Sequence, residues 1–386
     1  MFERPIYLNK MLQFKDSDAV KILAGVRGSG KSSLMKLYKM HLINEGIPVR
    51  NIVYMNFEGN DYQSINNEEK LRTVLNNLNL QIQDRIYWLF DEIQLVTGWQ
   101  RVINDLKVDY DCDVVVAGSD ADILSDELYD WIEIPIYPLS FQEFLEVKQI
   151  SSESKFINEA YSEFEKYGGM PALLLTSEEL KDTVLQGIFS SSILRDVAYK
   201  SVIKDSLTLN GVMDYLVRNT GALLNVSKIS NDLNSRGVYT SIPTVKRYLR
   251  LLETSYLFYH TKSYDIKAHE YLKTNSKYFI VDPGLNRCVS RGKSTMENII
   301  YIELKRRDYN VDIGYLDNSE IVFVAKRLKE VIWIKTVYEL SDVRSTMDNL
   351  NKVDDSCKKM LVSSYPQERN QTNGIEIKYI VDWLLE

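Results

Sequence analysis

Short apolar runs alternate with amphipathic stretches over the first third of the chain. The runs with the length and composition of buried strands lie at residues 20–24, 52–55, 86–90, 114–117 and 132–136. Alternation of such strands with helical patterns is typical of βαβ units, in which helices cover a parallel sheet. We therefore expect an α/β domain with a five-stranded parallel sheet at residues 1–140.

The periodicity becomes helical after residue 140. Phe141, Phe144 and Leu145 follow the i, i+3, i+4 spacing of one helix face. The turn at residues 167–171 interrupts this pattern. Residues 141–221 are therefore predicted to form a helical lid or linker.

Two helical stripes separated by a turn follow from residue 222. The first ends at Arg236-Gly237, and the second begins beside Pro243, which suits a first helical turn. Strand-like patterns near residues 256–258 and 277–280 then predict a β-hairpin wing. We expect a winged helix at residues 222–290. At residues 291–386 a helix and strand-like runs at 320–325 and 331–337 predict a small α/β module.

The composition agrees with several globular domains. At 386 residues the chain exceeds the roughly 250–300 residues at which a single core stops growing. No run of about 18 uncharged apolar residues is present, and the first residues lack the pattern of a signal peptide. We expect a cytoplasmic protein without a membrane segment, whose Cys112, Cys288 and Cys357 are free thiols.

A sequence motif for phosphate binding, G-x-x-x-x-G-K-S, lies at residues 25–32 between an apolar strand and a helical stripe. This context identifies a P-loop, whose glycines let backbone N–H groups curl around a phosphate. Lys31 can reach the β and γ oxygens of ATP, and the Ser32 hydroxyl is expected to ligate Mg²⁺. The predicted nucleotide-binding residues are Gly25, Arg27, Gly28, Ser29, Gly30, Lys31, Ser32 and Ser33.

Acidic residues follow a later strand of the same domain, at Asp91-Glu92. We expect Asp91 to complete the Mg²⁺ site with Ser32, and Glu92 to act as the general base toward water. This order is typical of hydrolytic P-loop enzymes of the additional-strand class. The next strand ends at Ser119-Asp120. Ser119 is the predicted contact to the attacking water, while Asp120 fits that role and a turn or cap role equally well.

Several segments together carry a family resemblance. They lie at residues 25–34, 89–94, 117–119, 138–141, 167–171, 193–196, 244–249, 282–285 and 297–298. In these segments the chain resembles the bacterial and archaeal AAA-family predicted ATPases that carry an uncharacterised C-terminal region. The resemblance implies an AAA-type P-loop ATPase domain followed by a winged helix and a restriction-nuclease-like α/β domain.

The chain departs from this family at positions that matter for chemistry. Family members usually carry Gly-Arg before the strand that leads to Pro138, and this chain lacks it, so one cation for the transferring phosphate is missing. Arg101 and Arg195 remain as candidate arginine fingers. Asp120 stands where the family more often has a neutral amide.

The C-terminal domain has also lost acidic residues of the family pattern. Val322 and Trp333 stand where family members have acids, while Lys335 and Glu297 remain. Glu320 is an acid on the strand of Val322, two residues away. Because Mg²⁺ needs one or two well-placed carboxylates, we predict that nuclease activity is absent.

Charge is distributed unevenly along the chain. Residues 227–280 carry nine Lys or Arg against four Asp or Glu, so this segment is +5 within a chain of net charge −7. In a winged helix the second helix enters the major groove, where Lys246, Arg247 and Arg250 would meet DNA. The alternative is a solvated basic face on a module used for packing or oligomerisation.

Three functions remain open from the sequence. The first is an ATPase that acts as a switch on a nucleic-acid-binding arm. The second is an ATP-gated signalling or assembly protein with little turnover, and the third is a protein-remodelling ATPase. Accordingly, the expected ligands are ATP and Mg²⁺, and the candidate partners are DNA, another protein or further copies of the chain.

Overall fold

The structure is a computed structural model that divides into two compact units. It describes residues 2–78, 84–124, 127–193, 205–268, 270–290, 296–316, 319–352, 357–366 and 371–386. Unit 1 comprises Met1–Tyr137 and Thr254–Tyr256, and unit 2 comprises Pro138–Glu253 and Leu257–Glu386. Each unit has its own sheet.

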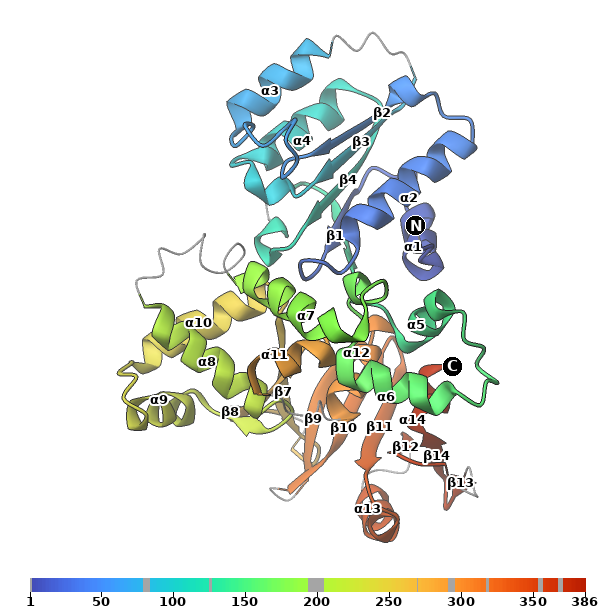
Figure 1. Ribbon diagram of the computed structural model, residues 1–386, viewed down its shortest axis with the longest axis vertical. Coiled ribbons are helices and arrows are strands. Elements are labelled where there is room, and N and C mark those ends of the chain that lie inside the picture. Colours follow the sequence, from blue (N-terminus) through green and yellow to red (C-terminus); the bar gives the residue numbers. More distant parts are fainter. Residues whose placement is uncertain are drawn as a thin grey trace. The chain divides into compact units, whose positions relative to one another are not determined.

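Unit 1 is a three-layer α/β domain (Figure 1). Its strands pair in parallel in the order β2-β3-β4-β1-β5, so the predicted five-stranded parallel sheet is confirmed. Helices α1 and α2 cover one side of the sheet, and α3 and α4 cover the other. The strands are β1 (Val20–Ala24), β2 (Ile52–Asn56), β3 (Ile86–Asp91), β4 (Cys112–Gly118) and β5 (Trp131–Pro135). The helices are α1 (Pro5–Gln13), α2 (Lys31–Asn44), α3 (Glu68–Asn77) and α4 (Trp99–Asp109), with short 3-10 turns η1 (Val49–Asn51), η2 (Ile93–Leu95) and η3 (Ala121–Ile123).

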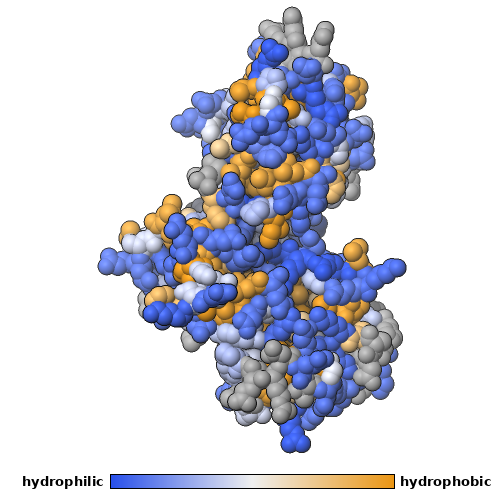
Figure 2. Space-filling view, turned by 90° about the vertical axis from the view of Figure 1, so that its right-hand side faces the viewer, coloured by the Kyte–Doolittle hydropathy of each residue, from blue (hydrophilic) through white to orange (hydrophobic). Residues whose placement is uncertain are grey.

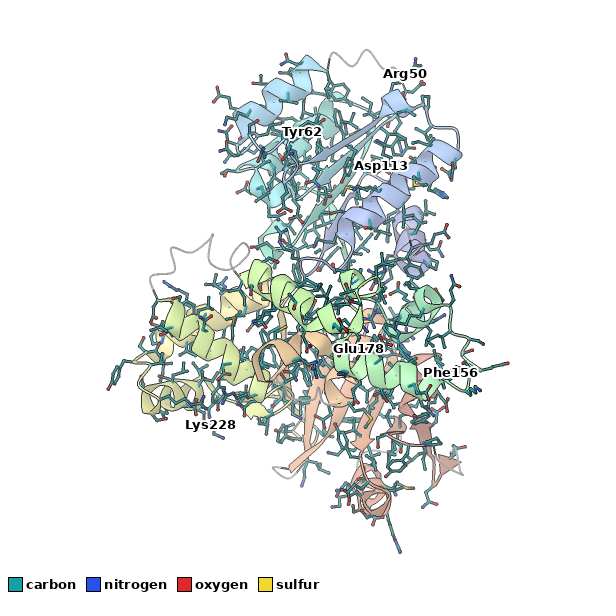
Figure 3. The ribbon with its side chains drawn as sticks, in the orientation of Figure 1. Arg50, Tyr62, Asp113, Phe156, Glu178 and Lys228 are labelled. Carbon is teal, nitrogen blue, oxygen red and sulfur yellow. The ribbon has the colours of Figure 1, made fainter. Side chains whose placement is uncertain are left out.

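The core of unit 1 explains why β1, β3 and β4 were visible as apolar runs. Every residue of β1 and β3 is buried, because both strands are interior to the sheet and helices cover both faces. On one face the side chains of α1 and α2, such as Tyr7 and Tyr38, pack against strand residues such as Leu89. Lys21 of β1 and Asp113 of β4 form a buried ion pair within the sheet at 2.8 Å. Asp113 is labelled in Figure 3.

The outer surface of α1 and α2 is partly apolar. Ile6, Met40 and Ile43 are exposed there although their helices also supply the core. Figure 2, which faces this side of unit 1, shows apolar side chains among hydrophilic ones. The two helices therefore carry apolar side chains on both their inner and outer surfaces.

Unit 2 is built on a nine-stranded sheet with the order β13-β14-β12-β11-β10-β9-β7-β8-β6. The strands are β6 (Leu223–Leu224), β7 (Phe258–Asp265), β8 (Glu270–Ile280), β9 (Asn310–Leu316), β10 (Ser319–Arg327), β11 (Glu330–Val337), β12 (Lys358–Ser363), β13 (Gln371–Thr372) and β14 (Ile375–Tyr379). The helices are α5 (Phe141–Lys148), α6 (Ile157–Tyr167), α7 (Glu178–Ser192), α8 (Ser206–Arg218), α9 (Val226–Ser235), α10 (Ile242–Thr254), α11 (Arg287–Ser290), α12 (Met296–Arg306), α13 (Val343–Asn351) and α14 (Ile380–Leu384), with 3-10 turns that include η4 (Pro171–Leu173) and η6 (Pro283–Asn286).

Two helices and a β-hairpin lie where the sequence predicts a winged helix, but the hairpin joins a larger sheet, and the winged helix stays a prediction. Helices α8, α9 and α10 precede the antiparallel hairpin β7-β8. Strand β7 also pairs in parallel with β9, with Ser263 opposite Ile313. The boundary expected at residue 290 therefore runs through one continuous sheet, and the four-part division of the chain stays a prediction.

Three sequence segments meet in unit 2 around one buried carboxylate. Asp282 accepts hydrogen bonds from the backbone N–H of Gly169 at 2.7 Å and of Gly284 at 2.9 Å. At Gly168 a Cβ would lie 1.8 Å from Asp282 Oδ1, so only glycine fits. The Gly169 carbonyl in turn accepts from the backbone of Leu139 at 2.8 Å. Segments 138–141, 167–171 and 282–285 thus form a single node, which we call the Asp282 node.

Two properties of the chain follow from the described residues. Cys112, Cys288 and Cys357 are free thiols and half-buried. No helix in the described ranges has the length and apolar composition needed to cross a bilayer.

Candidate nucleotide-binding site

The site is assembled at one edge of the unit 1 sheet. In parallel strands the carboxyl ends meet at the same edge. Ala24 at the end of β1 pairs with Gly118, and Asp91 at the end of β3 pairs with Ala117. The P-loop, the acidic pair and Ser119 therefore follow neighbouring strand ends.

The P-loop connects β1 to α2 and depends on its glycines. Gly28 has φ of 80° and Gly30 has φ of 103°, which is backbone that side chains rarely adopt. At Gly25 a Cβ would lie 2.2 Å from the carbonyl oxygen of Ile136. The loop thus requires glycine twice for its curvature and once for close packing.

Lys31 is folded back over this loop. Its Nζ donates to the carbonyl of Gly25 at 2.8 Å and to that of Val26 at 3.0 Å, and the side chain is buried. This places a positive charge inside the curve of the loop, where a phosphate chain would exchange for the carbonyls. The predicted role of Lys31 is compatible with this position.

The other predicted loop residues differ in their surroundings. Ser29 is buried, and its Oγ has no hydrogen-bond partner among the described residues. Ser33 is exposed, whereas Ser32 is half-buried at the start of α2. Arg27 forms an ion pair with Glu58 at 3.0 Å. Arg27 is therefore oriented by an acid that the sequence motif did not point to.

Asp91 has the surroundings of a metal ligand. It is fully buried at the end of β3, and its Oδ2 accepts from the hydroxyl of Tyr54 at 2.9 Å. Burial raises the pKa of Asp91 above its ordinary value, although the nearby hydroxyls of Ser32 and Tyr54 oppose the shift. The second oxygen, Oδ1, has no hydrogen-bond partner among the described residues, so it can serve a cation.

Any Mg²⁺ held here needs further ligands from outside the chain. The described residues contain no group of three or more His, Cys, Asp or Glu that could hold a metal by itself. Mg²⁺ is commonly bound by one or two protein ligands together with phosphates and water. Ser32 and Asp91 fit that mode of binding.

Glu92, Ser119 and Gln94 form a contiguous polar cluster beside the acid. Glu92 has φ of 55°, a left-handed conformation that turns its side chain out of the β3 direction. Its Oε2 accepts from Gln94 Nε2 at 2.5 Å and from the Ser119 hydroxyl at 3.4 Å. Ser119 therefore lies beside the candidate base, and its predicted contact with the attacking water stays a prediction. Asp120 is also buried, next to η3.

Gln94 was not identified as a site residue from the sequence. Its amide bonds Glu92 and also approaches Ser119 Oγ at 3.4 Å. At Gly118 a Cβ would lie 2.4 Å from Gln94 Oε1, so a glycine leaves room for this amide. The sequence offered one signal for Gln94, which is its position two residues after Glu92 within segment 89–94.

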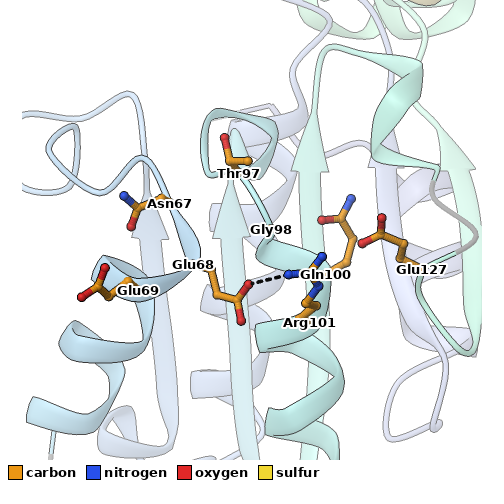
Figure 4. Close-up of a pocket in the computed structure, with 8 residues that line it drawn as sticks. All are labelled: Asn67, Glu68, Glu69, Thr97, Gly98, Gln100, Arg101 and Glu127. Carbon is orange, nitrogen blue, oxygen red and sulfur yellow. Dashed lines mark hydrogen bonds and ion pairs between the residues drawn. The ribbon is translucent and has the colours of Figure 1, made fainter.

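The candidate arginine fingers are not brought to this cluster by any described contact. Arg101 lies near the start of α4, where it pairs with Glu68 at 3.3 Å. Both line an open hollow of about 510 Å³, together with Asn67, Glu69, Thr97, Gly98, Gln100 and Glu127 (Figure 4). Arg195 lies outside the described residues. The source of a cation for the γ-phosphate therefore stays open.

The predicted nucleic-acid-binding residues lie on the exposed face of helix α10. On α10, Lys246, Arg247 and Arg250 are exposed, while Tyr248 and Leu249 are buried. Helix α10, which has 13 residues, presents three cations to solvent.

The C-terminal candidates are separated by the sheet of unit 2. Glu297 on α12 accepts from Thr336 at 3.2 Å and pairs with Lys277 at 3.4 Å. Trp333 belongs to the apolar cluster that includes α13. Since side chains alternate along β11, Lys335 shares the face of Trp333, and Thr336 lies on the other face with Glu297.

Comparisons with known proteins cover the whole chain. A family model described as an AAA domain matches residues 17–145, and one described as a domain of unknown function (DUF8612) matches residues 158–296. An uncharacterized protein of Haemophilus influenzae is 44% identical over 396 residues, which cover 100% of this chain and 99% of that protein. The structure of the Walker-type ATPase PABY2304 of Pyrococcus abyssi has a TM-score of 0.53 at 15% identity, over 75% of this chain and 96% of that chain. The last similarity shows a shared fold.

Proposed function

The chain belongs to the same family as the uncharacterized protein of Haemophilus influenzae, and it carries an AAA domain. From this premise we propose that it is a Mg²⁺-dependent ATPase that switches a nucleic-acid-binding arm. The observation that carries the proposal is the convergence of three parts at one sheet edge. These are the P-loop, the buried Asp91 beside Ser32, and the Glu92 and Ser119 pair.

The residues divide the work of hydrolysis among them. Lys31 and the loop N–H groups bind the β- and γ-phosphates, and Ser32 and Asp91 hold Mg²⁺, which neutralises charge on the transferring phosphate. Glu92 accepts a proton from the attacking water, and Ser119 helps to orient that water. Each group lies in unit 1, so this unit contains the hydrolytic residues that the proposal needs.

The arm of the proposed switch is the basic face of α10. Its three exposed cations can neutralise phosphates of a duplex, and a helix of this size fits the major groove. The surrounding segment is +5 in a chain that is otherwise acidic, which favours one localised contact with nucleic acid.

ATP turnover measured with and without duplex DNA tests the proposal. We expect DNA to raise kcat in the wild-type chain, and Glu92→Gln to remove both basal and stimulated turnover. A wild-type chain that hydrolyses ATP at the same rate with and without DNA or RNA would contradict the switch, and an absence of ATP binding would contradict the ATPase.

A second function, an ATP-gated assembly protein with little turnover, is favoured by one contact. Gln94 occupies the Glu92 oxygen that would otherwise accept from water, at 2.5 Å. If Gln94 restrains the base, Gln94→Ala raises kcat above that of wild type. If Gln94 positions the base for hydrolysis, as the leading proposal requires, the same variant lowers kcat without changing ATP affinity.

A further inference from the structure

A buried arginine outside the motifs contacts the P-loop. Arg4, immediately before α1, is 4% exposed, and its Nη1 donates to the Ser29 carbonyl at 2.8 Å. Its guanidinium also lies over the Tyr7 ring, 4.4 Å from the centroid. Charged donors make stronger hydrogen bonds than neutral ones, and burial strengthens them further. The Ser29 carbonyl and the Tyr7 ring thus hold the guanidinium against the P-loop.

The contact with Ser29 sets the direction of the next N–H group. A trans peptide is planar, so its carbonyl and its N–H point in opposite directions. Holding the Ser29 carbonyl toward Arg4 therefore turns the Gly30 N–H away from Arg4. Gly30 begins α2 with φ of 103°, and the N–H groups at this end of the helix are the ones that bind phosphate.

The other arm of the same guanidinium binds the end of unit 1. Arg4 Nη2 donates to the carbonyl of Tyr137 at 3.0 Å, and the Tyr7 hydroxyl accepts from the Tyr137 N–H at 3.4 Å. Tyr137 is the residue at which the chain leaves unit 1, and Pro138 is the first residue of unit 2. The preceding residue, Ile136, packs its carbonyl against Gly25 at the start of the loop.

We propose that Arg4 is a positioning residue that orients the phosphate-binding peptide and links nucleotide occupancy to the segment at Tyr137. The inference rests on the proposed binding of Mg·ATP at the P-loop. When a phosphate accepts a hydrogen bond from the Gly30 N–H, the peptide plane between Ser29 and Gly30 rotates, and the Ser29 carbonyl moves with it. Because Arg4 donates to this carbonyl and to that of Tyr137, the movement is transmitted to Tyr137. Occupancy is therefore reported where the chain passes to unit 2.

The test uses the full chain as wild type, Arg4→Ala, Arg4→Lys and, as a matched control, Arg50→Ala, in which an exposed arginine of unit 1 is removed (Figure 3). Mg·ATP affinity is measured by titration, and hydrogen exchange is followed in peptides 25–34 and 134–141 with and without saturating Mg·ATP. We expect wild type and Arg50→Ala to gain protection in both peptides.

Arg4→Ala should bind Mg·ATP about ten- to a hundredfold more weakly, and at saturation it should protect 25–34 but not 134–141. A residue that only stabilises the fold would leave this ATP-dependent difference intact. Arg4→Lys, whose single ammonium cannot serve two carbonyls as the guanidinium fork does, covers the case in which Arg4→Ala does not fold. It should lose part of both effects.

Two results overturn the proposal and are distinguishable. If wild type binds Mg·ATP and both Arg4 variants match it in affinity and in protection of 134–141, only the role of Arg4 is wrong. If wild type itself binds no Mg·ATP, the proposed function is wrong, and the role of Arg4 is lost with it.

Discussion

At the scale of single residues, Lys31 is the side chain on which nucleotide binding depends most directly. Its ammonium lies within the loop, held by two carbonyls, and no uncharged side chain can balance the phosphate charge there. We expect Lys31→Ala to abolish ATP binding or weaken it greatly, as measured by calorimetric titration. Lys36→Ala removes an exposed lysine of the same helix and should bind as wild type. Unchanged affinity in Lys31→Ala would refute the P-loop assignment.

Glu92 should affect turnover and leave binding intact. It follows Asp91, the proposed metal ligand, and its carboxylate contacts Ser119. Replacement by Gln keeps the shape and removes the base, so hydrolysis should slow by roughly two or more orders of magnitude. Single-turnover rates with pre-bound ATP would separate this effect from affinity. Glu92→Gln that hydrolyses ATP at the wild-type rate would exclude Glu92 as the base.

The residues of the site that the sequence revealed are those that belong to local patterns. Lys31, Asp91 and Glu92 stand at fixed offsets from strands that are apolar throughout, so their location could be predicted. Arg4 could not be assigned a role, because its partner Ser29 lies 25 residues away and only the fold brings the two together. The contact of Gln94 with Ser119 is equally distant in sequence, although its contact with Glu92 is local. Long-range polar contacts of this kind leave no periodic signal.

At the scale of elements, the Asp282 node should make the stability of unit 2 depend on pH. Burial raises the pKa of Asp282 to about 6 from 3.8, and hydrogen bonds from Gly169 and Gly284 only partly offset it. The folded chain therefore binds this proton more tightly than the unfolded chain. The stability contributed by the proton is fully present below pH 3.8 and is lost as pH rises through about 6, by an amount on the order of 3 kcal/mol.

Chemical unfolding at several pH values checks this expectation against Asp282→Asn. The variant cannot titrate, so its unfolding free energy should change less between about pH 4 and pH 7 than that of wild type. His260, whose pKa burial lowers, acts in the opposite direction as pH falls, and it is common to both proteins. Equal pH dependence in the two proteins would show that Asp282 does not titrate in this range.

The basic face of α10 gives the second prediction at this scale. Neutralising Lys246, Arg247 and Arg250 together should weaken duplex binding. It should also reduce the slope of log K against log salt concentration by an amount that corresponds to up to about three released counterions. Neutralising Lys155, Lys329 and Lys352, which are exposed elsewhere in unit 2, changes the net charge equally and should leave the slope unchanged. Absence of duplex and single-strand binding in wild type at low salt would refute the nucleic-acid role.

For the whole molecule, element types were easier to predict than the way elements join. The runs at 320–325 and 331–337 correspond to β10 (Ser319–Arg327) and β11 (Glu330–Val337), because apolar alternation marks a strand locally. The pairing of β7 with β9 links residues that are 50 apart, such as Ser263 and Ile313, and nothing in either run encodes that register. The hydrophobic pattern therefore could not predict that one sheet continues across the domain boundary expected at residue 290.

The last prediction is that the whole chain does not cleave DNA. Restriction-type cleavage needs carboxylates on neighbouring strand ends that hold Mg²⁺, with a lysine beside them. In unit 2 the remaining acid of the family pattern, Glu297, forms an ion pair with Lys277 and accepts a hydrogen bond from Thr336. Lys335 lies on the opposite face of β11 from Thr336, because side chains alternate along a strand. A glutamate on one face of a sheet and a lysine on the other cannot act together at one metal-bound phosphate.

Incubation of the full chain with plasmid, linear and single-stranded DNA, in Mg²⁺ or Mn²⁺, tests this directly, and we expect intact DNA. Val322 and Trp333 stand where family members have carboxylates. Glu320, on the neighbouring strand β10, is the acid that could replace those carboxylates. Cleavage that disappears in Glu320→Ala or Lys335→Ala would therefore show that a working metal site exists. Cleavage that persists in both variants would show that it does not come from a site built on Glu320 and Lys335. If the DNA stays intact, the C-terminal module serves packing or binding. ATP hydrolysis in unit 1 is then the reaction that we expect of this chain.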